Sequence, residues 1–183
     1  MVKERTVILI MIISLIFSCK KSIKNSEVII DKSNNDEFVK KLEKQMSFIK
    51  GKKISSLSKI VGDTINTSNK VFFLYNGFDC EVCIDIGYEI GKKIDSINNG
   101  KLVNIISSSS NVGRDQLKNN YKNFVFNDEK DLIRKELKFI YTPVFIILNN
   151  DSEVKDIFFP NYVRNKKEEE TFIKKCIENS QKF

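Results

Sequence analysis

The chain has 183 residues, of which 41% are hydrophobic, and its net charge of +7 comes from 31 Lys and Arg against 24 Asp and Glu. This composition predicts one folded domain with an appendage and excludes wholesale disorder. The absence of histidine excludes Ser-His-Asp and Cys-His catalysis, His-ligated metals and a histidine pH switch. Any nucleophilic or redox chemistry therefore centres on the four cysteines.

The positive charge does not point to nucleic acid. Basic residues are spread along the whole chain and usually lie within a few residues of Asp or Glu. A nucleic-acid-binding surface would instead gather basic residues, often Arg, among exposed aromatic side chains. We therefore expect no nucleic-acid partner.

The N-terminal segment has the pattern of a secretory signal peptide. Lys3 and Arg5 precede the apolar run Val7–Phe17, and Cys19 follows shortly after it. The run is too short to cross a bilayer, which takes about 20 apolar residues. The residues around Cys19 resemble the lipobox of bacterial lipoproteins. That resemblance implies a lipoprotein signal peptide over residues 1–18 and attachment to the lipid bilayer through Cys19; an ordinary signal peptide with a coincidental cysteine is the alternative.

The residues after Cys19 predict a tether and then a domain. Residues 19–35 are polar and predict a lipidated tether, which leaves residues 36–183 for one folded domain. A lipoprotein acts outside the cytoplasm, here on the periplasmic side of a membrane, where thiols oxidise and stay oxidised.

Hydrophobic periodicity predicts the elements of this domain in chain order. We expect helices over residues 36–51, 82–97, 114–121, 129–137 and 166–182, and strands over 70–75, 102–106, 124–126, 144–148 and 153–159. Asn127 or Asp128 is the expected cap of the fourth helix, and residues 54–69 are ambiguous between a short strand and a loop. This order predicts an α/β fold with strands parallel across the helical crossovers and a final antiparallel hairpin.

Two motifs carry the chemistry. Cys80 and Cys83 lie where a predicted strand ends and a helix begins, so their sulfurs can close a tight disulfide ring. The unpaired N–H groups and the dipole of the helix start favour a thiolate at Cys80, which makes Cys80 the nucleophile and Cys83 the resolving thiol. Pro143, one of only two prolines, follows Thr142 and opens an apolar strand, where no ladder donor is required.

Together these motifs resemble the thioredoxin-like family, most closely its membrane-tethered extracytoplasmic members, over roughly residues 36–180. The resemblance implies a three-layer fold, in which a central mixed sheet has helices on both faces. It implies that Cys80 attacks and Cys83 resolves. It also implies that Pro143 is cis and, with the Thr142 backbone, pairs with a bound substrate strand. No cofactor is expected beyond a redox-active Cys80–Cys83 disulfide.

Acidic residues around the pair depart from the family pattern. Asp79 stands where the family often has Trp, and Glu81 and Asp85 follow closely. We expect these three carboxylates to oppose the helix field and raise the pKa of Cys80, which would make the couple reducing. Asp85 or Glu89 could assist proton transfer, or could simply form a solvated helix face.

Two functions remain open from the sequence. The preferred one is a lipid-anchored thiol–disulfide oxidoreductase that acts on extracytoplasmic protein disulfides and receives electrons from a membrane-embedded dithiol donor. The alternative is a non-catalytic binding or accessory lipoprotein in which the C-x-x-C is a structural disulfide. We expect no metal site, because the pair has no second pair of ligands to complete a zinc site. We expect Cys176 to be a small core residue.

Overall fold

The computed structural model describes residues 32–62, 66–98, 100–160 and 165–181. The predicted signal peptide, Cys19 and most of the predicted tether lie outside them. In chain order the described elements are α2 (Lys32–Ile49), α3 (Ser56–Val61), β1 (Val71–Tyr75), α4 (Glu81–Ile97), β2 (Val103–Ser107), α5 (Val112–Lys118), β3 (Val125–Asn127), α6 (Leu132–Glu136), β4 (Val144–Leu148), β5 (Val154–Phe158) and α7 (Lys166–Ser180).

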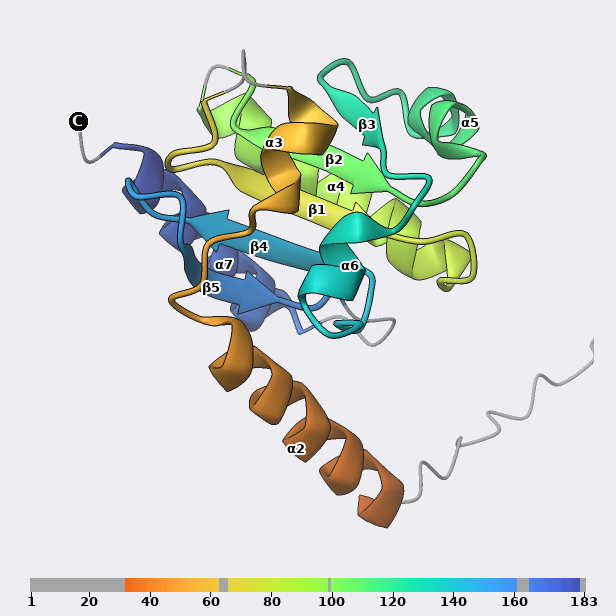
Figure 1. The fold of residues 1–183 in the computed structure, drawn as a ribbon, viewed down its shortest axis with the longest axis vertical. Coiled ribbons are helices and arrows are strands. Elements are labelled where there is room, and N and C mark those ends of the chain that lie inside the picture. The colour runs from red at the N-terminus through yellow and green to blue at the C-terminus, as the bar shows by residue number, and fades with distance from the viewer. Residues whose placement is uncertain (1–31, 63–65, 99, 161–164, 182–183) are drawn as a thin grey trace, which may run out of the picture. The chain divides into compact units, whose positions relative to one another are not determined.

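The five strands form one mixed sheet in the order β3-β2-β1-β4-β5 (Figure 1). β1 pairs parallel with β2, and β2 pairs parallel with β3. β4 and β5 form the predicted antiparallel hairpin. This order, with helices on both faces of the sheet, is a thioredoxin-like fold, as the sequence resemblance implied. β1 lies at the centre of the sheet, between β2 and β4, and is buried along its whole length. The turn that follows β1 therefore begins from a strand that is paired on both sides.

The direction of β4 corrects the sequence prediction. Strands were expected to run parallel across every helical crossover, but β4 pairs antiparallel with β1, with Leu74 opposite Val144. The segment between β3 and β4 contains only the five-residue helix α6, and it does not run back along the sheet as the crossover that contains α4 does. The chain therefore enters β4 at the end of the sheet where it left β3, next to the end of β1.

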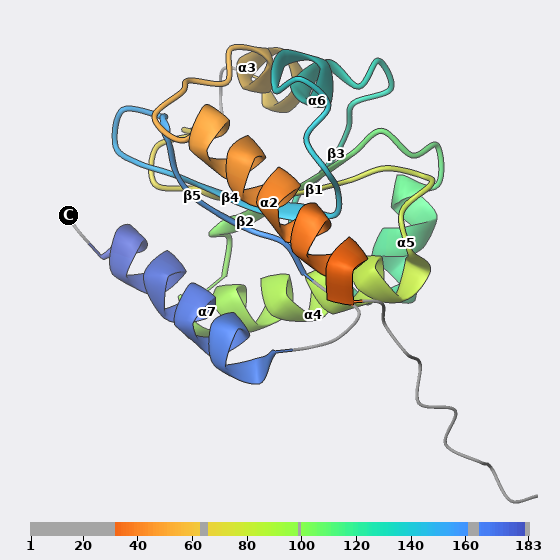
Figure 2. The ribbon, with the colours of Figure 1, turned by 90° about the horizontal axis from the view of Figure 1, so that it is seen from below.

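Helices lie on both faces of the sheet (Figure 2), and a layer of buried hydrophobic side chains lies between the helices and the sheet on each face. Alternate β1 side chains point to opposite faces. Val71, Phe73 and Tyr75 pack with α4 and α7, whereas Phe72 and Leu74 pack against the layer that contains α3, α6 and the end of α2.

Helix α4 packs closely on β1 through a glycine. A Cβ atom on Gly87 would lie 2.0 Å from Cζ of Phe73, so only glycine fits this approach. Ile86, Ile90 and Ile94 form a buried stripe on α4. Val82 and Ile97, at the two ends of the helix, are 50% and 58% exposed.

The ambiguous segment 54–69 contains a helix, α3, that a distant residue caps. Both carboxylate oxygens of Glu136 take part: they accept hydrogen bonds from the backbone N–H groups of Ser55 and Ser56 at 2.7 and 2.8 Å. These groups would otherwise lack a partner at the helix start. Asp128 likewise accepts from the N–H groups of Leu132 and Ile133 at 2.9 and 3.0 Å. The N-cap position of α6 is Asp131, three residues later than Asp128, but the side chain of Asp128 does bond the start of the helix.

Candidate active site

The two cysteines lie at the start of α4, directly after the turn that follows β1. Cys80 is the N-cap residue of α4, and its Sγ accepts a hydrogen bond from the backbone N–H of Cys83 at 3.4 Å. Cys80 is exposed, whereas only 8% of Cys83 is exposed. The helix start therefore presents Cys80 to a partner molecule and keeps Cys83 behind it.

The pKa of Cys80 is lowered, which contradicts the predicted effect of the nearby carboxylates. The largest cause is a hydrogen bond from the side chain of Cys83, followed by one from the backbone N–H of Cys83. Burial acts in the opposite direction, and the backbone N–H of Val82 lowers the pKa further. Asp79 raises the pKa, but it has the smallest of these effects. The start of the helix thus favours the thiolate at Cys80, and the expected net rise of its pKa is wrong, although Asp79 acts in the expected direction.

Two of the three carboxylates are engaged by a lysine from another helix. The ammonium group of Lys118, at the end of α5, lies 2.6 Å from an oxygen of Glu81 and 2.8 Å from one of Asp85. Asp85 also accepts a hydrogen bond from the side chain of Asn119 at 3.0 Å. Burial opposes the ionisation of Asp85, but these donors still hold its pKa below the ordinary value. Asp85 is therefore a paired carboxylate and a poor proton carrier at neutral pH.

The third carboxylate, Asp79, is turned inward and half-buried. Its Oδ2 accepts from the backbone N–H of Asn76 at 2.7 Å, and its Oδ1 accepts from the Asn76 side chain and from the Thr142 hydroxyl, both at 2.9 Å. Burial raises the pKa of Asp79 despite these hydrogen bonds. The sequence leaves two roles open for Asp85 and Glu89, proton transfer or a solvated helix face. It places Asp79 only among the carboxylates that oppose the helix field and does not predict its hydrogen bonds to Asn76 and Thr142. The signal in the sequence was the Asn-Gly-Phe-Asp turn, whose residues commonly hydrogen-bond their own backbone.

The predicted proline loop lies beside this turn. The Thr142–Pro143 peptide bond is cis, as the resemblance implied. Pro143 is buried and Thr142 is half-buried. Because Thr142 is hydrogen-bonded to Asp79, which precedes Cys80, the structure brings the C-x-x-C turn and the Thr142–Pro143 loop together.

The remaining predicted residues lie elsewhere. Glu89 is exposed on α4, six residues beyond Cys83 and therefore about 9 Å further along the helix axis. Cys176 is fully buried in the core on the α4 and α7 side of the sheet, which confirms its predicted packing role. Burial raises the pKa of the Cys176 thiol, so it is unreactive in the folded state.

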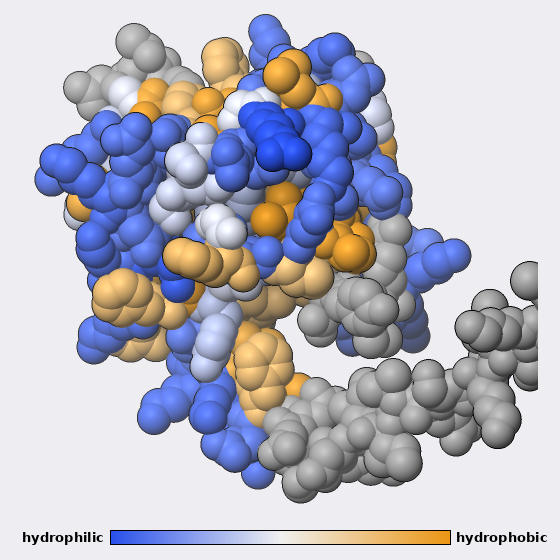
Figure 3. Space-filling view, turned by 90° about the vertical axis from the view of Figure 1, so that its right-hand side faces the viewer, coloured by the Kyte–Doolittle hydropathy of each residue, from blue (hydrophilic) through white to orange (hydrophobic). Residues whose placement is uncertain are grey.

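Exposed apolar residues surround the approach to Cys80. Phe78 is 100% exposed, and Val82 and Tyr141 are 50% and 40% exposed. Figure 3, which faces the side of the molecule at which β1 ends, shows apolar residues gathered in the middle of a largely hydrophilic face. Apolar surface next to a reactive thiol is suited to contact with a protein partner.

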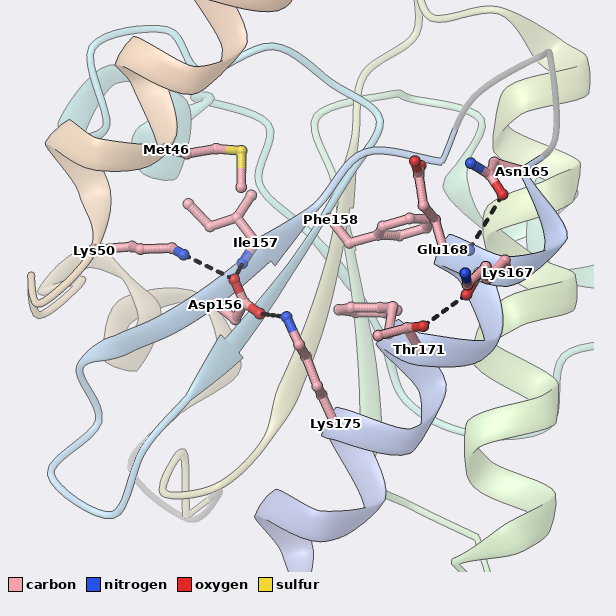
Figure 4. A pocket seen from close by; sticks show the side chains of 11 residues that line it. Met46, Lys50, Asp156, Ile157, Phe158, Asn165, Lys167, Glu168, Thr171 and Lys175 are labelled. Carbon is pink, nitrogen blue, oxygen red and sulfur yellow. Dashed lines mark hydrogen bonds and ion pairs between the residues drawn. The ribbon is translucent and has the colours of Figure 1, made fainter.

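A cavity of ≈ 590 Å³ lies away from the thiol pair, between β5, α7 and the end of α2. Figure 4 shows Asp156 of β5 between Lys50 and Lys175, at 3.0 and 2.7 Å, and its carboxylate also accepts from the N–H of Ile157. The two ion pairs connect the end of α2 and the helix α7 to the edge strand β5, and the hydrogen bond to Asp156 satisfies the backbone N–H of Ile157. This protects the edge from pairing with another chain.

Within the described residues, no helix is long and apolar enough to cross a membrane, and no cluster of three or more His, Cys, Asp or Glu side chains could hold a metal ion. The predicted lipidation of Cys19 concerns a residue outside this part of the chain.

No family model and no curated protein matches the sequence. Solved structures resemble it at low identity. A secreted Mycobacterium tuberculosis disulfide oxidoreductase homologous to E. coli DsbE is 10% identical over 61% of this chain and 84% of its own, with a TM-score of 0.46. The Xanthomonas campestris bacterioferritin comigratory protein is 7% identical over 63% and 83%, with a TM-score of 0.44. StoA from Bacillus subtilis is 14% identical over 58% and 82%, with a TM-score of 0.40.

Proposed function

We propose that this protein is a lipid-anchored thiol–disulfide oxidoreductase that acts on disulfides of extracytoplasmic proteins. The observation that carries the proposal is the environment of the two thiols. Cys80 is exposed at a helix start with a lowered pKa, and Cys83 lies buried directly behind it. An accessible thiolate with a second thiol in reach is the arrangement that disulfide exchange requires.

The reaction proceeds in two exchange steps. The Cys80 thiolate attacks one sulfur of the substrate disulfide, which forms a mixed disulfide and releases the other substrate sulfur as a thiolate that takes up a proton. Cys83 then loses its proton and attacks the Cys80 sulfur, which releases the second substrate thiol. The substrate gains two electrons, and the Cys80–Cys83 pair becomes a disulfide. In the reverse direction the same steps oxidise a substrate dithiol.

The loop beside the thiols would hold the substrate. In this proposal the substrate binds as an extended strand along Thr142 and Pro143, with its disulfide above Cys80. Asp79 fixes the distance between this loop and the cysteine turn, because it accepts hydrogen bonds from both sides. Because the helix start favours the Cys80 thiolate and Asp79 opposes it, the direction of electron flow depends on the reduction potential of the pair relative to its partners.

The location of the protein rests on the sequence. The lipobox-like segment ending at Cys19 supports a lipid anchor outside the cytoplasm. A protein that reduces disulfides there needs electrons from across the membrane, so a membrane-embedded dithiol protein is the proposed donor. Its reaction with the Cys80–Cys83 disulfide would repeat the two exchange steps in the opposite sense.

Trapping of the mixed disulfide tests the proposal. Without a resolving thiol, a Cys83→Ala variant should accumulate mixed disulfides through Cys80, visible as dithiothreitol-sensitive adducts on non-reducing gels. A Cys80→Ala/Cys83→Ala variant is the matched control and should form none, and a Cys176→Ala/Cys83→Ala variant should form as many as Cys83→Ala. If Cys83→Ala forms no adducts and the wild-type protein cannot reduce a protein disulfide, the protein is not an oxidoreductase and the accessory function takes its place.

A further inference from the structure

A groove of ≈ 350 Å³ lies between α2 and the segment that leads from α6 to Pro143. We call it the basic groove; α2 contributes Lys41, Lys44 and Phe48 to it, and the segment after α6 contributes Leu137, Lys138 and Tyr141.

The basic groove is joined to the thiol site by hydrogen bonds. The side-chain Oε1 of Gln45, on α2, accepts from the backbone N–H of Tyr141 at 3.0 Å. The next residue, Thr142, donates to Asp79 at 2.9 Å, and Asp79 directly precedes Cys80. A substrate strand that lies along Thr142 and Pro143 therefore reaches the groove within a few residues of its target cysteine.

The charges in the groove are of one sign. None of its lining residues is acidic. Lys41 forms an exposed ion pair with Glu37 at 2.8 Å. Lys44 and Lys138 form no ion pair with the residues that the structure describes, and the Lys138 ammonium lies 4.4 Å from the centre of the Phe48 ring. Two ammonium groups beside a reactive site thus lack a carboxylate partner, and a partner molecule can supply one.

The groove also offers apolar surface. The rings of Phe38 and Tyr141 meet edge to face at 5.4 Å, and both side chains are about 40% exposed. Phe48 and Leu137 lie deeper in the same groove. A partner that fits this surface combines carboxylates with at least one apolar side chain.

We propose that the basic groove binds an acidic segment of the substrate protein, close in sequence to the cysteine that Cys80 attacks. The groove selects substrates whose cysteine is flanked by Asp or Glu and an apolar residue. This inference rests on the proposed function for the identity of the partner, but binding to the groove can be measured without any turnover.

The direct test compares the binding of two fluorescently labelled peptides to the purified full-length chain. Each peptide is short, has Leu near its centre and Ser in place of the target cysteine. One carries Glu on both sides, and the other carries Gln at the same positions. The test variant is Lys44→Glu/Lys138→Glu. The matched control is Lys101→Glu/Lys122→Glu, which makes the same charge change on exposed side chains near the start of β2, at the opposite end of the sheet.

We expect the Glu peptide to bind the wild-type protein about tenfold more tightly than the Gln peptide at low salt, with the preference shrinking as salt is added. Lys44→Glu/Lys138→Glu should abolish this preference without weakening the Gln peptide. Lys44→Gln/Lys138→Gln, which changes the shape less, should reduce the preference in part. The control pair should change it less than about twofold. Circular dichroism of each variant should match the wild-type spectrum.

Three outcomes would overturn the inference. The wild-type protein could bind both peptides equally, or the control pair could lose as much preference as the test pair, which would make the effect one of net charge. Alternatively, Lys44→Glu/Lys138→Glu could lose binding to phosphatidylglycerol vesicles while it keeps its peptide preference, which would make the groove a membrane contact. If disulfide exchange fails while the groove still binds the Glu peptide, the proposed function is wrong and the inference about the groove stands. Among protein disulfide substrates, wild-type turnover should follow the same Glu-over-Gln order.

Discussion

Cys80 and Cys176 belong to helices that pack on the same face of the sheet, yet their thiols lie in opposite environments. Cys80 caps the start of α4, where backbone N–H groups have no partner within the helix, and hydrogen bonds from Cys83 lower its pKa. Cys176 lies in the middle of α7 within the core, where burial raises its pKa more than its own backbone N–H lowers it. The comparison shows that both the burial of a cysteine and its position on a helix set its reactivity.

The largest expected difference between these two thiols is in their rate of alkylation. In the reduced native protein, iodoacetamide should modify Cys80 at least about a thousandfold faster than Cys176, because Cys176 reacts only after local opening of the core. The rate at Cys80 should rise with pH as its thiolate forms, and its midpoint should lie below the ordinary thiol value of 9.0, since the folded state lowers this pKa. Timed quenching and mass spectrometry of peptides measure both rates.

Denaturant provides the control for this difference. In the unfolded chain both cysteines should react at similar rates with midpoints near the ordinary thiol value. Similar rates in the native protein, or a native midpoint for Cys80 at or above 9.0, would contradict the assignment of Cys80 as the activated thiol.

The same comparison predicts that serine substitutions at the two cysteines change the free energy of unfolding by unequal amounts. Cys176→Ser should lower the free energy of unfolding by about 1–3 kcal/mol, because it places a hydroxyl among apolar side chains. Cys80→Ser should change it by less than about 0.5 kcal/mol, since the side chain is exposed and serine is also a good cap. Urea unfolding of the two variants, both reduced, measures this. A larger loss from Cys80→Ser would mean that Cys80 has a structural role.

The sequence predicted the elements and the two thiols well because both depend on local pattern. Strands such as 144–148 and the start of α4 are encoded by hydrophobic periodicity and by the residues next to them in the chain. The positions of Cys80 and Cys83 at the start of α4 likewise follow from the local pattern. The direction of β4 was predicted wrongly because it depends on the path of the segment that joins β3 to β4, and hydrophobic periodicity does not encode that path.

The prediction of the electrostatics around Cys80 was wrong for a different reason. Proximity in sequence placed Glu81 and Asp85 against the helix field, but Lys118, more than thirty residues later, engages both of them. Asp79 was counted with them, yet it is half-buried and accepts a hydrogen bond from Thr142, 63 residues away. Side-chain partners that are remote in sequence decide these pKa values, and a pattern of charges along one chain does not identify them.

The smallest effect that we expect is a shift in the pKa of Cys80, which distinguishes Asp79 from the other two nearby carboxylates. Asp79 is the carboxylate whose charge raises the pKa of Cys80, against the hydrogen bonds from Cys83 that lower it. Asp79→Asn removes that charge and keeps a side chain of similar size, so the titration midpoint of the Cys80 thiolate should move to lower pH. A more stable thiolate stabilises the reduced pair, so the couple should become more oxidising. Ultraviolet absorbance of the thiolate and equilibration with glutathione measure the two changes.

Asp85→Asn is the matched control, because Lys118 already lies against that carboxylate and the pKa of Cys80 should hardly change. Exchange rates should change only about two- to fivefold in Asp79→Asn, since Asn76 and Thr142 keep part of their hydrogen bonding. A larger shift of the thiolate midpoint in Asp85→Asn than in Asp79→Asn would show that the sequence-based view of the carboxylates was correct. A shift to higher pH in Asp79→Asn would mean that Asp79 supports the thiolate through the geometry of the turn.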